Sequence, residues 1–271
     1  MNEFKSFHPF VNLIYFVFVI GFSCLIMNPV CLAISFFGSF LYSVVLKGSK
    51  GLKTNLIYIL PTVILMAIIN PLFNHQGATV INYLPDGNPL TLESVVYGIC
   101  AAVMIAGVIF WFSCFNEIMT SDKLIYLFGR VIPSLSMMLS MTLRFVPRFT
   151  KELKEIASTQ KAIGRDISSG SLVRRAKNGL HILSVMATRS LENSIETADS
   201  MKARGYGLPK RTSFSIFQFK SRDKLALWLI VILVCYVISG SILNAVYFSY
   251  FPMLKIARPD AFSISVYIVY L

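Results

Sequence analysis

The chain has 271 residues, of which 55% are hydrophobic and only 14% are charged. Soluble globular domains carry about 25% charged residues, so this composition excludes an ordinary water-soluble protein and indicates that lipid is part of its solvent. The net charge of +12 is concentrated in one segment. Residues 144–224 hold 17 of the 25 Lys and Arg but only 7 of the 13 Asp and Glu.

Long uncharged stretches predict the membrane-spanning helices, because a helix needs about 20 mostly apolar residues to cross a bilayer. We expect five spans in an all-α, polytopic membrane protein: Phe10–Met27, Pro29–Leu46, Asn55–Phe73, Ser94–Phe115 and Leu225–Phe248. Pro61 predicts a kink that neighbouring helices tolerate. Residues 74–92 are rich in Gly, Pro and Asn, which predicts a loop. Ala261–Leu271 is too short to cross.

The distribution of Lys and Arg predicts the orientation, because these residues are retained on the cytoplasmic side. Lys5 and the lysines at 47, 50 and 53 place the N-terminus and the first polar loop in the cytoplasm. The cation-free loop 74–92 and the C-terminus are then outside, in a multi-pass protein of the cell membrane.

The apolar stretch Leu124–Leu143 raises a conflict, because a crossing there would put the basic segment outside. Arg130 and Pro133 interrupt it. We therefore expect it to dip into the membrane or lie along its inner face. The predicted division of the chain is 1–123 for the first four spans, 124–224 for a cytoplasmic coupling domain, and 225–271 for the last span and a short tail.

The basic segment predicts two helices, roughly Pro147–Ile163 and Val173–Arg204. Gly164 and Gly205 follow their ends, where a left-handed glycine commonly closes a helix, and both ends read Lys-Ala-x-Gly. The second helix repeats apolar residues at steps of three or four, and acids occupy the opposite side. The apolar positions are Leu180, Leu183, Ala187, Leu191, Ile195, Ala198 and Met201; the acids are Glu192, Glu196 and Asp199. A basic amphipathic helix of this kind predicts a partner surface or contact with the membrane interface.

Four stretches together resemble the T component, the transmembrane coupling subunit, of energy-coupling factor (ECF) transporters: "NPLFNHQG", "DGNPLTLES", "LRFVPRFTKEL" and "ADSMKARGYG". The resemblance implies a non-catalytic subunit of an ATP-driven uptake complex for a vitamin or a metal. It implies that two Ala-Arg-Gly helix ends insert into grooves on two ATPase subunits, the same or different. The rest of the protein would grip a substrate-binding S component, which would topple and release its cargo when the ATPases close.

The resemblance assigns the ATPase-binding residues to the two helix ends. The second end maps onto Ala203, Arg204 and Gly205, and the first onto Ala162, Ile163 and Gly164, with Arg165 beside them. Arg144 and Pro147 match the start of the first coupling helix, and Glu196 and Asp199 are taken to support the second.

The first end departs from the family pattern, because Ile163 stands where the family has arginine. Arg165 is two positions further on, which is about 200° around an α-helix. It can take the place of the missing arginine only if the chain leaves helical geometry at Gly164. Otherwise the two ATPase contacts are chemically unequal.

The sequence gives little support for other functions. "GSKGLKT" (48–54) lacks the glycine directly before lysine that a phosphate-binding loop requires. We predict no catalytic residues, metal site or cofactor, and ATP hydrolysis falls to the partner subunits. Interleaved acids argue against nucleic acid, whereas contact with the lipid bilayer fits. A stand-alone secondary transporter or channel and a membrane-bound lipid enzyme remain the alternatives. The four uncharged runs lack the intramembrane ionisable residues that mark ion-coupled carriers.

Overall fold

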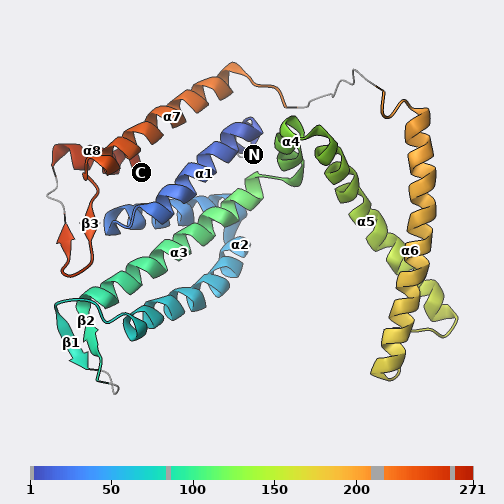
Figure 1. Ribbon diagram of the computed structural model, residues 1–271, viewed down its shortest axis with the longest axis horizontal. Helices are drawn as coiled ribbons and strands as arrows, with labels where there is room; N and C mark the ends of the chain where they lie inside the picture. The colour runs from blue at the N-terminus through green and yellow to red at the C-terminus, as the bar shows by residue number, and fades with distance from the viewer. Residues whose placement is uncertain (1–2, 84–86, 209–216, 257–259, 271) are drawn as a thin grey trace. The chain divides into compact units, whose positions relative to one another are not determined.

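The computed structural model describes residues 3–83, 87–208, 217–256 and 260–270. Its principal elements are helices (Figure 1): α1 Pro9–Leu25, α2 Pro29–Phe73, α3 Leu92–Ile118, α4 Ser121–Val131, α5 Pro133–Ala162, α6 Leu172–Ala203, α7 Ser221–Ile242 and α8 Ala261–Tyr270. A short 3₁₀ turn, Glu3–Ser6, precedes α1. The chain forms two compact units, one made of residues 1–124 with 217–271 and the other of residues 125–216. The predicted all-α, polytopic membrane fold is confirmed.

Among the described residues, three helical segments are long and apolar enough to cross a membrane: Pro29–Gly48, Leu92–Ile118 and Ser221–Ile242. They coincide with three of the predicted spans. Pro9–Leu25 and Ile59–Phe73 are apolar but shorter, with 17 residues in the first. At 1.5 Å per residue, that helix rises about 26 Å, against a hydrocarbon core of about 30 Å. The total of five crossings stays a prediction.

The first polar loop is smaller than the sequence suggested. α2 continues across it, and the one residue with non-helical backbone angles inside α2 is Gly48, at φ 62° and ψ −165°. The two halves of α2 therefore meet at a glycine that adopts a conformation disfavoured for other residues. Pro61 and Pro71 both lie inside the second half.

The last predicted span, Leu225–Phe248, was too long, because α7 ends at Ile242. Asn244 adopts φ 58°, and the next backbone N–H, of Ala245, donates to the carbonyl of Gly240 at 2.9 Å. This is a helix-closing turn with asparagine in the left-handed position that glycine usually takes. Phe248 instead begins β3, Phe248–Ser249, which pairs with β4, Lys255–Ile256.

Residues 74–92 also hold more structure than the predicted loop. β1, Val80–Tyr83, pairs antiparallel with β2, Pro89–Thr91. The buried carboxylate of Glu93 accepts hydrogen bonds from the backbone N–H and the hydroxyl of Thr79, the latter at 2.8 Å. The hairpin is thereby fixed to the start of α3.

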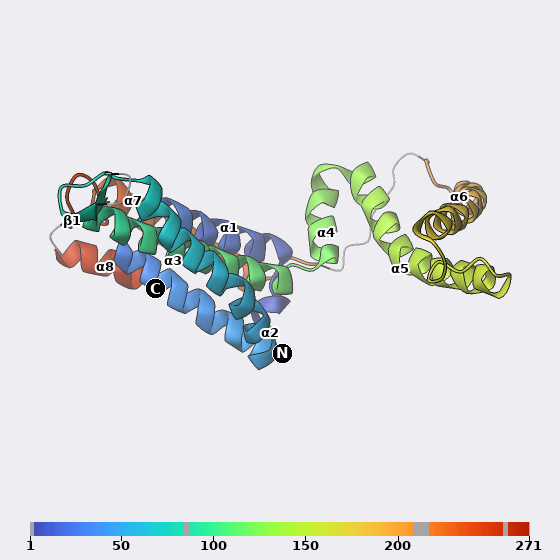
Figure 2. The same ribbon diagram turned by 90° about the horizontal axis from the view of Figure 1, so that it is seen from below.

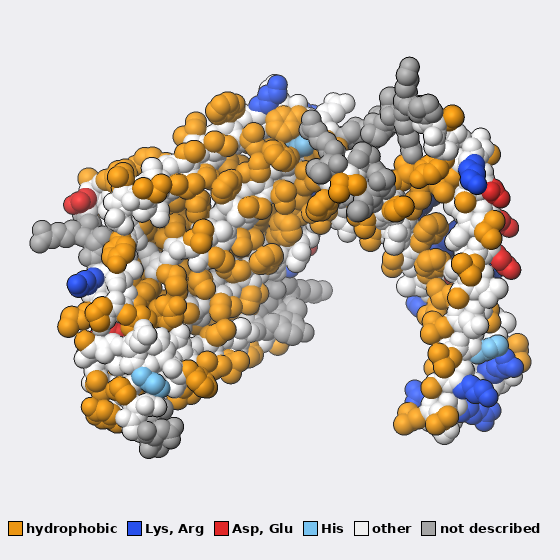
Figure 3. Space-filling model, viewed as in Figure 1, with side chains coloured by type: hydrophobic (Ala, Val, Ile, Leu, Met, Phe, Trp, Pro, Cys, Tyr) orange, Lys and Arg blue, Asp and Glu red, His pale blue; other side chains and the backbone are white. Residues whose placement is uncertain are grey.

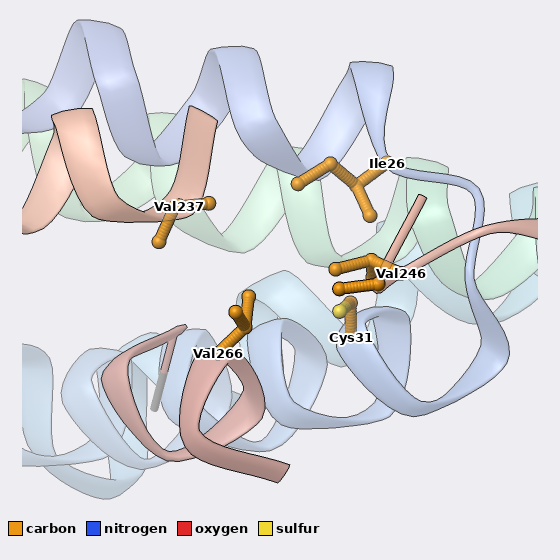
Figure 4. Close-up of a cluster of buried hydrophobic side chains, with 6 residues drawn as sticks. Ile26, Cys31, Val237, Val246 and Val266 are labelled. Atoms are coloured by element: carbon orange, nitrogen blue, oxygen red, sulfur yellow. The ribbon is translucent and has the colours of Figure 1, made fainter. Parts of the chain in front are cut away.

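Side chains from α1, α2 and α3 pack the interior of the first unit. Phe16, Trp111, Cys114 and Ile118 form one buried cluster, and the Trp111 indole donates to the Ser35 hydroxyl at 3.0 Å. A second cluster joins distant parts of the chain (Figure 4): Ile26, Cys31, Val237, Ala245, Val246 and Val266. Val266 lies on α8, so the short C-terminal helix that the sequence left unplaced packs into this cluster.

The N-terminal segment ties together the two places where the chain leaves and re-enters the first unit. Near the exit, the Lys5 ammonium pairs with Glu117 at 3.2 Å, and the Lys123 ammonium donates to the Lys5 carbonyl at 2.8 Å. At the re-entry, the His8 backbone N–H donates to the carboxylate of Asp223 at 3.0 Å. Burial, and to a lesser degree the nearby Lys5, lower the pKa of Lys123.

Candidate partner-docking helix ends

The end of α5 is closed by a pair of backbone hydrogen bonds around a left-handed glycine. Gly164 adopts φ +83°. Its N–H donates to the Lys161 carbonyl at 3.0 Å, and the Arg165 N–H donates to the Gln160 carbonyl at 2.9 Å. This pattern is the Schellman motif, which satisfies carbonyls that the end of a helix would otherwise leave unpaired. The chain leaves helical geometry at Gly164, which is the condition under which Arg165, two positions after Ile163, could replace the missing arginine.

The end of α6 repeats the same motif. Gly205 adopts φ +82°, its N–H donates to the Lys202 carbonyl at 3.0 Å, and the Tyr206 N–H donates to the Met201 carbonyl at 3.0 Å. The residue before each glycine also matches, with φ −85° and ψ 10° at Arg204. The prediction that Gly205 closes this helix is confirmed.

Equal geometry establishes which residues of the two ends are equivalent. Ile163, at φ −87° and ψ 6°, occupies the position of Arg204. Arg165 occupies the position of Tyr206, one residue beyond the glycine. Leaving the helix at Gly164 therefore does not bring Arg165 to the backbone position that Arg204 has.

The two helix ends expose different side chains to solvent. Ile163 is 68% exposed. Arg204 is exposed too, and it forms no side-chain hydrogen bond or ion pair with another described residue. The Arg165 guanidinium instead contacts His181 on α6, with Nη1 2.7 Å from Nε2, and Lys161 pairs with Asp166 at 3.5 Å.

The connection between α5 and α6 is fastened to the first turns of α6. The Asn178 amide donates to the Asp166 carbonyl at 2.9 Å, and Arg175 Nε donates to the Ile167 carbonyl at 2.6 Å. The Ser168 backbone N–H, then its hydroxyl, and then Lys161 lower the pKa of the Asp166 carboxyl. The α5 end thus lies beside the start of α6, as both views show (Figures 1 and 2).

The two helices contact each other through a small mixed interface. Ile156 and Ile182 are 6% and 2% exposed, and Arg189 pairs with the largely buried Glu152 at 3.2 Å. This interface was not predicted from the sequence. The spacing of the interface residues could have indicated it. Glu152 and Ile156 are one helical turn apart, and Ile182 and Arg189 are two turns apart, so each pair lies on one side of its helix.

The predicted apolar stripe of α6 lies mostly outside this interface. Its large members are exposed: Leu180 68%, Leu183 56%, Leu191 67% and Ile195 65%. Ala187 is exposed as well, whereas Ala198 and Met201 are half-buried. Figure 3 shows Lys and Arg side chains gathered over the first turns of α6 and acidic side chains along its later turns. α6 therefore carries an apolar stripe, a cluster of cations over its first turns, and its acids in its later turns.

The predicted supporting residues lie on α5 and α6 away from the α5 end. Arg144, Pro147, Glu196 and Asp199 are all exposed. Pro147 does not begin the first coupling helix, because α5 starts at Pro133 and runs through it. An interior proline forfeits one backbone hydrogen bond, and the helix continues here despite that loss.

The structure thus defines a class of protein: a polytopic helical membrane protein with a separate helical unit that presents two exposed, glycine-closed helix ends. Among the described residues, no group of His, Cys, Asp and Glu could hold a metal ion. Residues 5–216 match the family described as CbiQ, Cobalt transport protein. The chain therefore belongs to this family, which comprises transmembrane T components of ECF transporters.

Curated relatives carry the name Energy-coupling factor transporter transmembrane protein EcfT. The one from Staphylococcus aureus (strain 04-02981) is 34% identical over 106 residues, 39% of this chain and 40% of the relative. The one from Brevibacillus brevis is 37% identical over 107 residues, with 39% and 40% covered. The one from Bacillus selenitireducens is 30% identical over 176 residues, with 61% and 65% covered. The chain thus spans about two fifths of the length of the first two relatives, and the resemblance to ECF T components is confirmed.

Proposed function

We propose that this chain is the coupling subunit of an ATP-driven uptake transporter. Its α5 and α6 ends dock on two ATPase subunits, and its remaining surface holds a substrate-binding S component. The protein itself hydrolyses no ATP. The transported vitamin or metal is a property of the S component.

One observation carries this proposal: the same Schellman motif closes both α5 and α6, and it leaves Ile163 and Arg204 exposed. Two equivalent, solvent-facing helix ends suit a pair of related partner surfaces. The two ends are well separated, because His181, beside the α5 end, and Arg204 are about 35 Å apart along a helix that rises 1.5 Å per residue. A separation of this size suits one subunit at each end.

Arginine at the α6 end fits the docking role chemically. Its guanidinium presents a fixed fork of donors for carboxylates and backbone carbonyls. Arg204 has no such acceptor among the described residues, so it is available to a partner.

The exposed apolar stripe of α6 supports the second part of the proposal. Contiguous apolar surface of this kind commonly marks a protein or membrane contact. We assign the stripe to the S component, which it would contact on the cytoplasmic side of the membrane. Leu191→Ser with Ile195→Ser is expected to lower recovery of the S component while ATPase recovery is retained.

The docking role is tested by replacing Arg204. Arg204→Ala is expected to reduce both ATPase co-purification from native membranes and uptake by at least tenfold, with normal membrane insertion. Arg204→Lys keeps the charge but loses the fork, and should recover only part of the loss. Lys154→Ala, at an exposed cation on α5, is the matched control. Wild-type docking and transport by Arg204→Ala would refute the proposal.

A stand-alone carrier is the competing function. It predicts substrate accumulation by the purified protein alone in liposomes. The coupling role predicts none until ATPases and an S component are added.

A further inference from the structure

The two helix ends combine one backbone geometry with two different surface chemistries. At α6 the exposed residue before the glycine is Arg204, and at α5 the equivalent residue is Ile163, which is 68% exposed. The closing backbone geometry therefore does not distinguish the two ends for a partner, but the side chain before the glycine does.

The arginine near the α5 end does not remove the difference. Arg165 lies beyond Gly164, at the position that Tyr206 has in the other end. Its guanidinium lies 2.7 Å from the His181 ring nitrogen, and that ring belongs to α6. The neighbouring Lys161 pairs with Asp166. Both cations are thus directed to groups of the same unit, and Ile163 is the large exposed apolar side chain at the helix end.

We infer that Ile163 is a specificity-determining residue: the α5 end binds an apolar pocket on its ATPase, whereas the α6 end binds a pocket that carries a carboxylate. This inference rests on the proposed docking function. The two pockets are not interchangeable, because each rejects the other end. An arginine in an apolar pocket is a charge without a partner, and an isoleucine opposite a carboxylate leaves that carboxylate unpaired. The side chains at 163 and 204 thus fix the orientation in which the ATPase pair is held.

The inference makes a prediction opposite to that of the family pattern. Ile163→Arg restores the Ala-Arg-Gly sequence, so an acidic pocket would bind it at least as well as the wild type. An apolar pocket would bind it at least tenfold more weakly, since burying an isoleucine contributes roughly a tenfold to hundredfold gain in affinity. Ile163→Leu keeps the apolar character and should bind within about threefold of the wild type.

The experiment uses the full-length tagged chain in its native membrane. A photo-crosslinking residue replaces Ala162 in one series and Ala203 in another, so Ile163 and Arg204 stay in place. The quantity measured is the yield of crosslinked ATPase at each position, with Ile163→Arg, Ile163→Leu, Arg165→Ala or no further change. We expect Ile163→Arg to reduce crosslinking at 162 at least tenfold and at 203 much less. Arg165→Ala should change neither by more than about threefold.

Each contrary outcome has a separate meaning. Equal or stronger crosslinking at position 162 in Ile163→Arg would contradict the inference that the pocket is apolar. Loss of that crosslink in Arg165→Ala would also contradict it, because Arg165 would then be the binding group. A loss of similar size at both positions in Ile163→Leu also contradicts it. The absence of ATPase crosslinks at both positions in the otherwise wild-type chain would instead refute the proposed function.

Discussion

At the scale of single residues, the two glycines that close α5 and α6 determine where the docking side chains lie. Both adopt positive φ, which glycine tolerates and other residues resist. The sequence predicted these positions because Lys-Ala-x-Gly occurs at both ends. It could not predict that Arg165 contacts His181, because that contact depends on how the connection folds back onto α6.

Gly205→Ala tests the closure of α6. Alanine at φ +82° costs about 1 kcal/mol, and its Cβ would lie 3.0 Å from a methyl group of Leu208. We expect faster hydrogen exchange in peptides from 198–208 and weaker ATPase docking. Gly179→Ala is the control, because an added Cβ there meets nothing within 4 Å and alanine favours a helix. Unchanged exchange in Gly205→Ala would show that the left-handed glycine is dispensable.

At the scale of elements, α5 and α6 show what periodicity does and does not reveal. It located α6 to within a residue at each end, since apolar steps of three and four residues indicate a helix. It did not identify the face that contacts α5, because that face mixes Ile182 and Arg189 while the more regular leucine stripe is exposed. α5 was predicted from Pro147 onward, and its earlier start at Pro133 went unrecognised because proline is usually a boundary signal.

Ile182→Ala tests the small interface between these helices. Removing a buried isoleucine side chain costs about 2–4 kcal/mol, so hydrogen exchange across the middle of α5 and α6 should accelerate at least tenfold. Its neighbour Leu183 is 56% exposed, against 2% for Ile182, and Leu183→Ala should change exchange by less than about threefold. Equal effects of the two substitutions would contradict the assigned packing face.

At the scale of the whole molecule, charge and hydropathy predicted the polytopic helical fold, the basic helical segment and three of the long apolar spans. The N-terminal segment was beyond such reasoning. Its contacts with Glu117 and Asp223 join residues more than a hundred positions apart, and such pairs leave no local pattern. The two short hairpins were missed for a related reason, since their strands are only a few residues long.

Asp223→Ala tests the role of the N-terminal segment. The Asp223 carboxylate is 3% exposed and accepts from the backbone N–H groups of His8 and Lys220. Losing it leaves two donors without their acceptor, which costs about 1–3 kcal/mol. We expect a lower thermal unfolding midpoint in detergent and faster proteolysis of the N-terminus. The exposed Asp122 provides the control, Asp122→Ala, and a loss no larger than in this control would disprove the anchoring role.

The cytosolic location of residues 144–224 is the central claim, because only there can ATPases reach both helix ends. The most direct measurement uses a variant with all five native cysteines replaced by alanine and one new cysteine, Lys177→Cys on α6 or Gln76→Cys in the loop before β1. A membrane-impermeant thiol reagent is added to intact cells and to inside-out vesicles. We predict labelling of Lys177→Cys only in the vesicles and of Gln76→Cys only in the cells. Labelling of Lys177→Cys in intact cells would contradict the account.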